Sequence, residues 1–263
     1  MYCLVQFKIP INLIPKNVMN IINNTILITG GGSGIGLEIA KALNKYNKII
    51  IAGRNKEKLD AAAKGLENVF TIQADITNEQ DVNRLTEEIK VNFGGLNILI
   101  NNAGHAYAYT ISDTSDTYSK AVAEFETNYF APIRLTEKLI PLLKQQENAA
   151  VVNVSSIVAF APGSHVPTYS DSKAALHSYT KILRHELAKA TSVKVFELMP
   201  PLVNTDFSAE IGGKENGIPA SEVADSFVNA LINDIYEIRV GHTEVLYSNF
   251  FADSEGAFSV MNA

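Results

Sequence analysis

The segment most informative about the fold is Thr29-Gly30-Gly31-Gly32-Ser33-Gly34-Ile35-Gly36. It follows an apolar run, 25–29, and precedes a segment with helical spacing of apolar residues, 34–46. Glycine permits a tight turn and lets the backbone approach an anion, and the free amides at the start of the following helix point toward that anion. Between a first strand and a first helix, the pattern predicts a dinucleotide phosphate site, whereas an isolated glycine-rich stretch indicates only a turn. The candidate phosphate-binding residues are Gly30, Gly32, Ser33, Gly34, Ile35 and Gly36.

Strand-like runs alternate with helical segments along the rest of the chain. The runs are rich in β-branched residues and lack polar alternation, which is typical of strands buried on both faces of a parallel sheet. We therefore predict a single-domain α/β fold, a doubly wound, Rossmann-type parallel sheet of about seven strands with helices on both faces. The predicted strands are 25–29, 48–52, 69–73, 96–101, 150–155, 193–198 and 236–240, and the predicted helices are 34–46, 56–66, 78–92, 118–145, 167–190 and 220–234.

Three segments depart from this regular alternation. Pro132 lies inside the predicted helix 118–145 and is expected to kink it. Residues 201–219 show no period and predict a long loop beside the substrate. The last twenty residues are rich in aromatic side chains, which predicts docking on the body of the protein or on a neighbouring subunit.

The start of the chain is set apart by its composition. Residues 1–18 are interrupted by Pro10 and Pro15 and predict a flexible N-terminal extension, with an extra edge strand as the alternative. Met19 is a candidate for the functional start, which leaves 19–263 as one domain.

The composition argues against several classes of function. The net charge is −6 and no basic stripe occurs, so nucleic acid is not an expected partner. No apolar run approaches the ~18 residues of a membrane span. Cys3 is the only cysteine and no pair of histidines has zinc-ligand spacing, so no metal is expected. We expect a cytoplasmic protein that acts on a small molecule.

Five features, in order along the chain, resemble the short-chain dehydrogenase/reductase family over residues 20–263. They are the glycine stretch 29–36, Asn101-Asn102-Ala103-Gly104 after the fourth strand, Asn128, Ser156, and the pair Tyr169-x3-Lys173, with the family's interval of 13 residues from Ser156 to Tyr169. The segments 19–25, 174–178, 183–185 and 199–205 resemble more narrowly the DltE-type bacterial oxidoreductases. The resemblance implies an NAD(P)-dependent oxidoreductase that transfers hydride between nicotinamide and a carbonyl or alcohol (CH-OH) substrate.

The resemblance also implies the roles of four catalytic residues. Tyr169 is the general acid and base, and Lys173, four residues along the same helix face, favours its phenolate and holds the nicotinamide ribose. An ammonium at ~4.5 Å offers roughly 3.7 kcal/mol at an effective dielectric of 20, close to the ~4 kcal/mol that lowers a tyrosine pKa from about 10 to about 7. Ser156 donates a hydrogen bond to the substrate oxygen, whereas its neighbour Ser155 fits a serine that satisfies backbone at a strand end. Asn128 completes a proton relay behind the lysine, the alternative being an ordinary polar residue on a kinked helix.

The end of the second strand bears on the choice of cofactor. An NAD-preferring site places an acidic residue there, but this chain has Gly53 followed by Arg54. A guanidinium can bind a 2′-phosphate, so we predict NADP(H) over NAD(H), with stacking of Arg54 on adenine as the alternative. Ser33 stands where many NADP-dependent relatives carry a second basic residue. Further cofactor contacts implied by the family are Asp75, Ile76, Asn102, Ala103, Gly104, Tyr169, Lys173, Pro200, Val203 and Thr205.

The sequence says less about the substrate and the assembly. Candidate substrate residues are His105, Val158, His165, Leu202 and Phe207, although a solvated loop histidine is the plainer interpretation of His105. His177 is interpreted as a packing or surface residue. The family's habit of pairing through its two long helices implies a homodimer or homotetramer. Two other functions stay open: a non-catalytic NADP(H)-binding regulatory protein, and an epimerase or dehydratase on the same fold.

Overall fold

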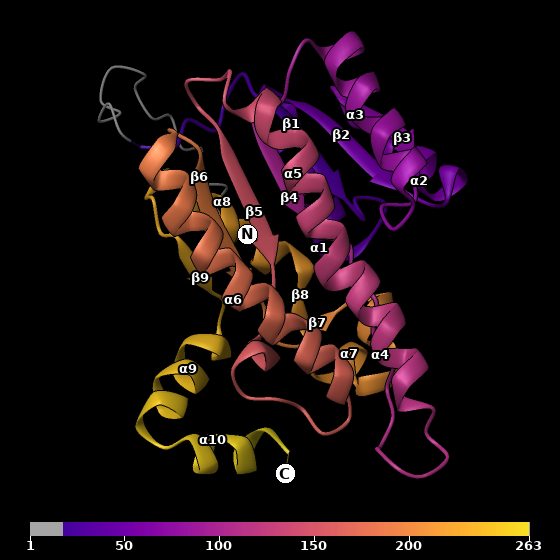
Figure 1. Cartoon of the computed structure of the whole chain (residues 1–263), viewed down its shortest axis with the longest axis vertical. Coiled ribbons are helices and arrows are strands. Elements are labelled where there is room, and N and C mark those ends of the chain that lie inside the picture. The colour runs from indigo at the N-terminus through magenta and orange to yellow at the C-terminus, as the bar shows by residue number, and fades with distance from the viewer. Residues whose placement is uncertain (1–17, 263) are drawn as a thin grey trace, which may run out of the picture.

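The computed structural model describes residues 18–262 and confirms the predicted fold (Figure 1). One sheet of seven strands, all paired in parallel, has the order β3-β2-β1-β4-β5-β6-β9. The strand order reverses between β1 and β4: β1 to β3 run toward one edge of the sheet, and β4, β5, β6 and β9 run toward the other. This is the doubly wound arrangement that alternating strands and helices predict. The strands are β1 (Thr25–Thr29), β2 (Lys48–Gly53), β3 (Val69–Gln73), β4 (Ile98–Asn101), β5 (Ala150–Val154), β6 (Lys194–Met199) and β9 (Glu237–Arg239).

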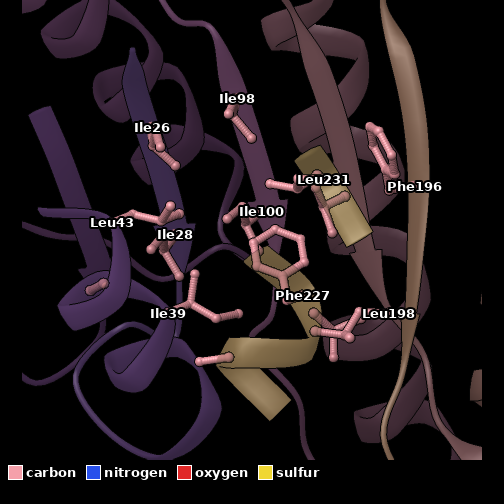
Figure 2. Packing of buried hydrophobic residues seen from close by; sticks show 14 of the residues in the cluster. Ile26, Ile28, Ile39, Leu43, Ile98, Ile100, Phe196, Leu198, Phe227 and Leu231 are labelled. Atoms are coloured by element: carbon pink, nitrogen blue, oxygen red, sulfur yellow. The ribbon is translucent and has the colours of Figure 1, made fainter. Parts of the chain in front are cut away.

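Helices cover both faces of the sheet and divide the core into two layers. On one face, α1 (Gly34–Leu43) and α8 (Ala220–Ile232) pack on alternate strand residues; Figure 2 shows Ile28 and Ile100 of this layer beside Phe227 of α8. On the other face, α3 (Glu79–Phe93), α5 (Ala131–Leu143) and α6 (Pro167–Ala190) cover the intervening residues. The short α2 (Lys56–Ala63) follows β2. The central strands β1, β4 and β5 are therefore buried on both faces, which explains their runs without polar alternation, whereas the edge strands β3 and β9 are only partly buried.

The prediction of one helix over 118–145 is wrong in its middle. The segment divides into α4 (Thr117–Phe125), a π-helical turn over Glu126–Phe130, and α5. In the turn, the Ala131 amide donates to the Glu126 carbonyl, five residues back. Pro132 has no amide hydrogen and cannot give the Asn128 carbonyl its α-helical bond. The proline thus favours a change of register before itself and lies in the first turn of α5.

Residues 201–219 are more regular than the predicted long loop. They contain β7 (Val203–Asn204) paired in parallel with β8 (Ile218–Pro219), a 3-10 turn over Asp206–Ile211, and α7 (Gly213–Asn216). Such short elements need few hydrogen bonds and leave no hydrophobic period in the sequence. Gly217 is required where they meet, because a Cβ there would lie 2.4 Å from the Gly213 carbonyl oxygen.

The C-terminal segment forms α9 (His242–Ala252) and α10 (Ser254–Met261), drawn in yellow beyond the lower end of the sheet in Figure 1. Leu246 and Ala257 pack with Phe160 and Met199 of the body in a third hydrophobic cluster. The C-terminal segment therefore packs against the body of its own chain, one of the two predicted docking places, and its contact with a neighbouring subunit stays a prediction.

The prediction of a flexible extension over 1–18 lies almost wholly outside the described residues, and it stays a prediction together with the proposed start at Met19. Across residues 18–262, no helix is both long and apolar enough to cross a membrane.

Candidate active site

A cleft of about 710 Å³ opens where the carboxyl ends of the strands meet the segment 201–219. Ligands of doubly wound sheets bind at this edge, where the strand order reverses. Most of the residues predicted from the sequence line it. They are Gly30, Gly32, Ser33, Gly34, Ile35, Arg54, Asp75, Ile76, Asn102, Ala103, Gly104, Ser156, Val158, His165, Tyr169, Lys173, Pro200, Leu202, Val203, Thr205 and Phe207.

The glycine stretch forms one wall of the cleft and leaves no room for side chains. Gly30 has a φ of +65°, and a Cβ there would lie 2.9 Å from the Ala103 Cα. Asn102 ties the turn to β4, because its Nδ2 donates to the Thr29 carbonyl at 2.9 Å and to the Gly30 carbonyl at 3.3 Å. α1 begins at Gly34 with no acidic residue in its first turn. Bare backbone and a free helix N-terminus fit the pyrophosphate of a dinucleotide.

Gly36 does not line the cleft, unlike Gly30, Gly32 and Gly34. A Cβ at this position would lie 2.5 Å from the Asn102 Nδ2. Gly36 therefore allows α1 to pack closely on the turns after β1 and β4, and its contact with the phosphates stays a prediction.

Two cations lie at the end of the cleft that is formed by the turn after β2 and by α2. Arg54 follows β2 as predicted, and Lys58, on the first turn of α2, is an addition that the sequence analysis missed. The Lys58 Nζ is 3.8 Å from an Asp206 carboxylate oxygen across the cleft mouth, and both side chains are largely exposed. The available signal was a further basic residue close behind Arg54 in the sequence, four positions further along.

The candidate catalytic side chains meet at the inner end of the cleft. Tyr169 lies in the first turn of α6, and Ser156, directly after β5, makes a hydrogen bond with it. The Lys173 Nζ lies 5.5 Å from the Tyr169 ring centroid and donates to the Val154 carbonyl at 2.8 Å. The helix brings Tyr169 and Lys173 to one face, and the strand end brings Ser156 to them.

Burial governs both titratable groups of this cluster. Burial raises the pKa of Tyr169 well above its usual value, and the Ser156 hydrogen bond opposes this only in part. Burial lowers the pKa of Lys173 to about 8, against the opposing effect of the Glu197 charge. The protein therefore keeps Tyr169 as a neutral proton donor, and holds Lys173 near the point where it can lose its charge.

Comparison of the sequence with known proteins points to the same family as the fold and the site. Residues 24–216 match the short chain dehydrogenase family. The uncharacterized oxidoreductase DltE of Bacillus subtilis (strain 168) is 36% identical over 249 residues, which cover 93% of this chain and 98% of that protein.

The chain belongs to the short-chain dehydrogenase family.

Solved structures of short-chain dehydrogenases have the same fold. One from Burkholderia cenocepacia J2315, in complex with NADP, superposes with a TM-score of 0.81 at 28% identity, over 93% of this chain and all 100% of that one. Another from Burkholderia phymatum, in complex with NAD, gives a TM-score of 0.77 at 21% identity, over 83% of this chain and 89% of that one.

Asn128 of this short-chain dehydrogenase does not line the cleft but fastens the chain behind it. Its Oδ1 accepts from the His105 amide at 2.8 Å, and its Nδ2 donates to the His105 carbonyl at 2.7 Å and to the Ser172 Oγ at 2.9 Å. These three bonds join the segment after β4 to α6, so Asn128 holds the two walls of the site together.

The prediction that His105 contacts substrate does not fit its position. Asn128 pins its backbone, its ring packs edge-on against Tyr107 with centroids 4.5 Å apart, and it lies outside the cleft lining.

The substrate end of this short-chain dehydrogenase is mainly apolar. Val158, Leu202 and Phe207 line it, and the Phe207 ring centroid lies 5.8 Å from that of Tyr169. His165 contributes from the turn before α6. His242 and Met261, from α9 and α10, also line the cleft and were not predicted. The only indication of them in the sequence was the aromatic C-terminal segment, which predicted docking but not contact with the cleft.

A buried carboxylate beneath the site also escaped the sequence analysis. Glu197 of β6 is fully buried and accepts a hydrogen bond from Ser155 at 2.5 Å. Ser155 thus binds a side chain rather than backbone, contrary to its predicted role. His177 Nδ1 lies 2.9 Å from both Glu197 oxygens, so His177 is an ionisable partner rather than a packing residue. Over residues 18–262, no three His, Cys, Asp or Glu side chains are grouped to hold a metal ion.

Proposed function

We propose that this short-chain dehydrogenase is an NADP(H)-dependent oxidoreductase that interconverts a carbonyl and an alcohol (CH-OH) group, with Tyr169 as the general acid and base. The observation that carries the proposal is the convergence of Ser156, Tyr169 and Lys173 at the inner end of the cleft beside the glycine wall, with Ser156 and Lys173 buried and Tyr169 partly exposed. NADP(H), when bound, supplies or accepts the hydride.

The protein's part in the reaction follows from the positions of these side chains. Ser156 donates a hydrogen bond to the substrate oxygen and stabilises the negative charge that develops there. In reduction, the Tyr169 hydroxyl gives its proton to that oxygen, and in oxidation the phenolate takes it back. The Lys173 ammonium favours the phenolate. Asn128 acts by keeping the segment after β4 in place beside α6.

The cofactor would lie along the cleft from the glycine wall to Tyr169. The amides at the start of α1 would hold its pyrophosphate, and Asp75 and Ile76 would contact the adenine. Asn102, Ala103 and Gly104 would border its middle, and Pro200, Val203 and Thr205 its nicotinamide amide. Arg54 and Lys58 would meet a 2′-phosphate, and together they favour NADP(H) over NAD(H).

The lining supports an uncharged, partly apolar carbonyl compound as substrate. Val158, Leu202, Phe207 and Met261 offer hydrocarbon walls, and His165 and His242 offer polar contacts. Apart from Lys173, no lysine or arginine lines the described cleft beyond Arg54 and Lys58, which lie at the adenosine end. A substrate carboxylate or phosphate would therefore lack a cation to pair with.

The buried triad favours turnover over the two alternatives. A protein that only binds a dinucleotide has no use for a partly buried tyrosine beside a buried lysine, since burying these polar groups costs free energy. An epimerase or dehydratase would show no net consumption of NADPH with any carbonyl.

The decisive experiment measures NADPH oxidation against a panel of uncharged ketones and aldehydes, in wild type and in Tyr169→Phe. We expect Tyr169→Phe to lower kcat by roughly 10²–10⁴-fold, because the proton donor is lost, with NADPH affinity unchanged. Tyr179→Phe is the matched control: Tyr179 lies on the same helix, partly buried against Tyr129, and outside the cleft. Equal activity of Tyr169→Phe and wild type would refute the proposal.

We further propose that the enzyme is a cytoplasmic homodimer or homotetramer. Val122 of α4, Phe130 of the π-helical turn and Ile182 of α6 are 46%, 45% and 60% exposed, and these are apolar side chains on the two long helical segments. Sedimentation equilibrium measures the assembly directly, and a monomer would contradict it.

A further inference from the structure

A row of polar residues crosses the sheet beneath α6, in a layer that is otherwise hydrophobic. Asn101, Asn153, Glu197 and Glu237 are partners in register on β4, β5, β6 and β9. Residues in register on parallel strands point to the same face, and here this is the face that α5 and α6 cover. Glu197 is fully buried in the middle of this row.

The Glu197 carboxylate is held rigidly at both oxygens. Ser155 Oγ donates to Oε1 at 2.5 Å, and His177 Nδ1 lies 2.9 Å from Oε1 and Oε2. A buried carboxylate costs several kcal/mol unless it is hydrogen-bonded or paired, so its presence calls for compensation in structure or in function.

Glu197 adjoins the lysine of the active site through two neighbouring contacts. Lys173 precedes His177 by one turn of α6, and the Lys173 Nζ donates to the carbonyl of Val154, the residue before Ser155. The Glu197 charge raises the pKa of Lys173 against the effect of burial. Lys173 is 3% exposed, so water screens this interaction little.

The other charges around Glu197 are paired with one another. Glu237, its neighbour on β9, contacts Arg184 of α6 at 3.4 Å and Arg239 of its own strand at 2.6 Å. From β5, only the uncharged Asn153 and Ser155 face it. Lys173 is thus the buried cation on which the Glu197 charge acts, while His177 is a hydrogen-bond partner of the carboxylate.

We propose that Glu197 is a positioning residue of this enzyme: its carboxylate, fixed by Ser155 and His177, holds Lys173 in the ammonium form beside Tyr169. The inference rests on the proposed function of Tyr169 and Lys173. In this arrangement Glu197 of β6 keeps Lys173 charged, and the charged Lys173 in turn favours the phenolate of Tyr169.

The first test is the pH profile of kcat for carbonyl reduction in wild type and Glu197→Gln. The glutamine keeps the shape and the hydrogen bond from Ser155 but removes the charge. We expect the alkaline limb, where Lys173 loses its proton, to move down by about one pH unit or more. Glu197→Asp, which keeps the charge, should restore most of the profile.

Glu237→Gln is the matched control because it removes the same charge from the adjacent strand, at a residue paired with arginines. Its alkaline limb should stay at the wild-type pH. A purely structural role of Glu197 would lower kcat equally at every pH without moving the limb. An unmoved limb in folded Glu197→Gln therefore overturns the proposal.

Two further measurements test the proposal even if Glu197→Gln does not fold or no substrate is turned over. His177→Phe, at a side chain that is 17% exposed, removes one hydrogen-bond donor to the carboxylate and should move the limb in the same direction by less. An NMR titration of lysine Nζ, with Lys173→Arg to assign the signal, reads Lys173 without any substrate. A lower Lys173 pKa in Glu197→Gln supports the inference even if the carbonyl panel shows no turnover, and an unchanged Lys173 pKa overturns it.

Discussion

Arg54 and Lys58 are the residues that we expect to set the proposed preference for NADP(H). Both cations line the adenosine end of the cleft, where a 2′-phosphate would carry a charge that NAD(H) lacks. We expect Arg54→Ala and Lys58→Ala each to weaken NADPH binding about tenfold, or ~1.4 kcal/mol, and to leave NADH binding unchanged. Titration of reduced-nicotinamide fluorescence with both cofactors measures this.

The control is Lys56→Ala, at a lysine on the same helix that is tied to Asp60 and does not line the cleft. Equal loss of NADPH and NADH affinity in Arg54→Ala would mean that Arg54 stacks on adenine. NADH binding as tightly as NADPH to the wild type would show that the assignment of Arg54 and Lys58 is wrong.

At the scale of elements, α4 and the π-helical turn hold the segment after β4 against α6. Glu124 of α4 is fully buried, and accepts from the Tyr107 amide at 2.8 Å and from the Thr168 hydroxyl at 2.5 Å. Thr168 immediately precedes Tyr169, so this carboxyl helps to seat the catalytic turn. One turn further, Asn128 joins the same two segments.

Burial raises the pKa of Glu124, although its two hydrogen bonds oppose the shift. The unfolded chain then releases this proton at a lower pH than the folded protein does, so folding loses stability as pH rises from the ordinary glutamate pKa through the raised one. Glu124→Gln carries no such proton. We expect the free energy of unfolding of Glu124→Gln, relative to wild type, to rise with pH across that window and then level off.

Urea denaturation at a series of pH values measures this difference. Glu222→Gln, at an exposed position on α8, is the control and should show no such trend. A relative stability of Glu124→Gln that stays flat or falls with pH would show that burial does not dominate at this carboxyl.

At the scale of the whole molecule, α9 and α10 complete the substrate end of a cleft that the sheet alone leaves open. Phe250 packs against Phe160, with ring centroids 6.0 Å apart, and His242 and Met261 line the cleft. Phe250→Ala should loosen both helices and raise the substrate KM by about tenfold, because the apolar wall is lost, with NADPH affinity unchanged.

Steady-state kinetics with the best carbonyl of the panel, together with the fluorescence titration, separates these two effects. Phe251→Ala removes an equal side chain that is 66% exposed, and it should leave KM near the wild-type value. An equal rise of KM in both variants would mean that general loosening, rather than the docked face, matters.

Features that depend on residues close together in the chain, such as strands, helices and the glycine turn, could be predicted from the sequence alone. Strand runs, helix periods and the glycine stretch 29–36 gave the doubly wound sheet, because burial on both faces and backbone conformation are local properties. The spacing of Tyr169 and Lys173 placed both on one helix face for the same reason.

Only the tertiary structure decided which distant segments meet. Glu197 lies beneath Lys173 because β6 pairs with β5 under α6, and no period along the chain encodes that neighbour. Met261 reaches the cleft because two helices dock around Phe160. Asn128 faces away from the cleft because Pro132 favours a change of helical register before it. The placement of Glu197 and Met261 depends on packing between segments far apart in sequence, which composition and spacing do not contain, whereas the change of register at Asn128 begins at Pro132, four residues further along the chain.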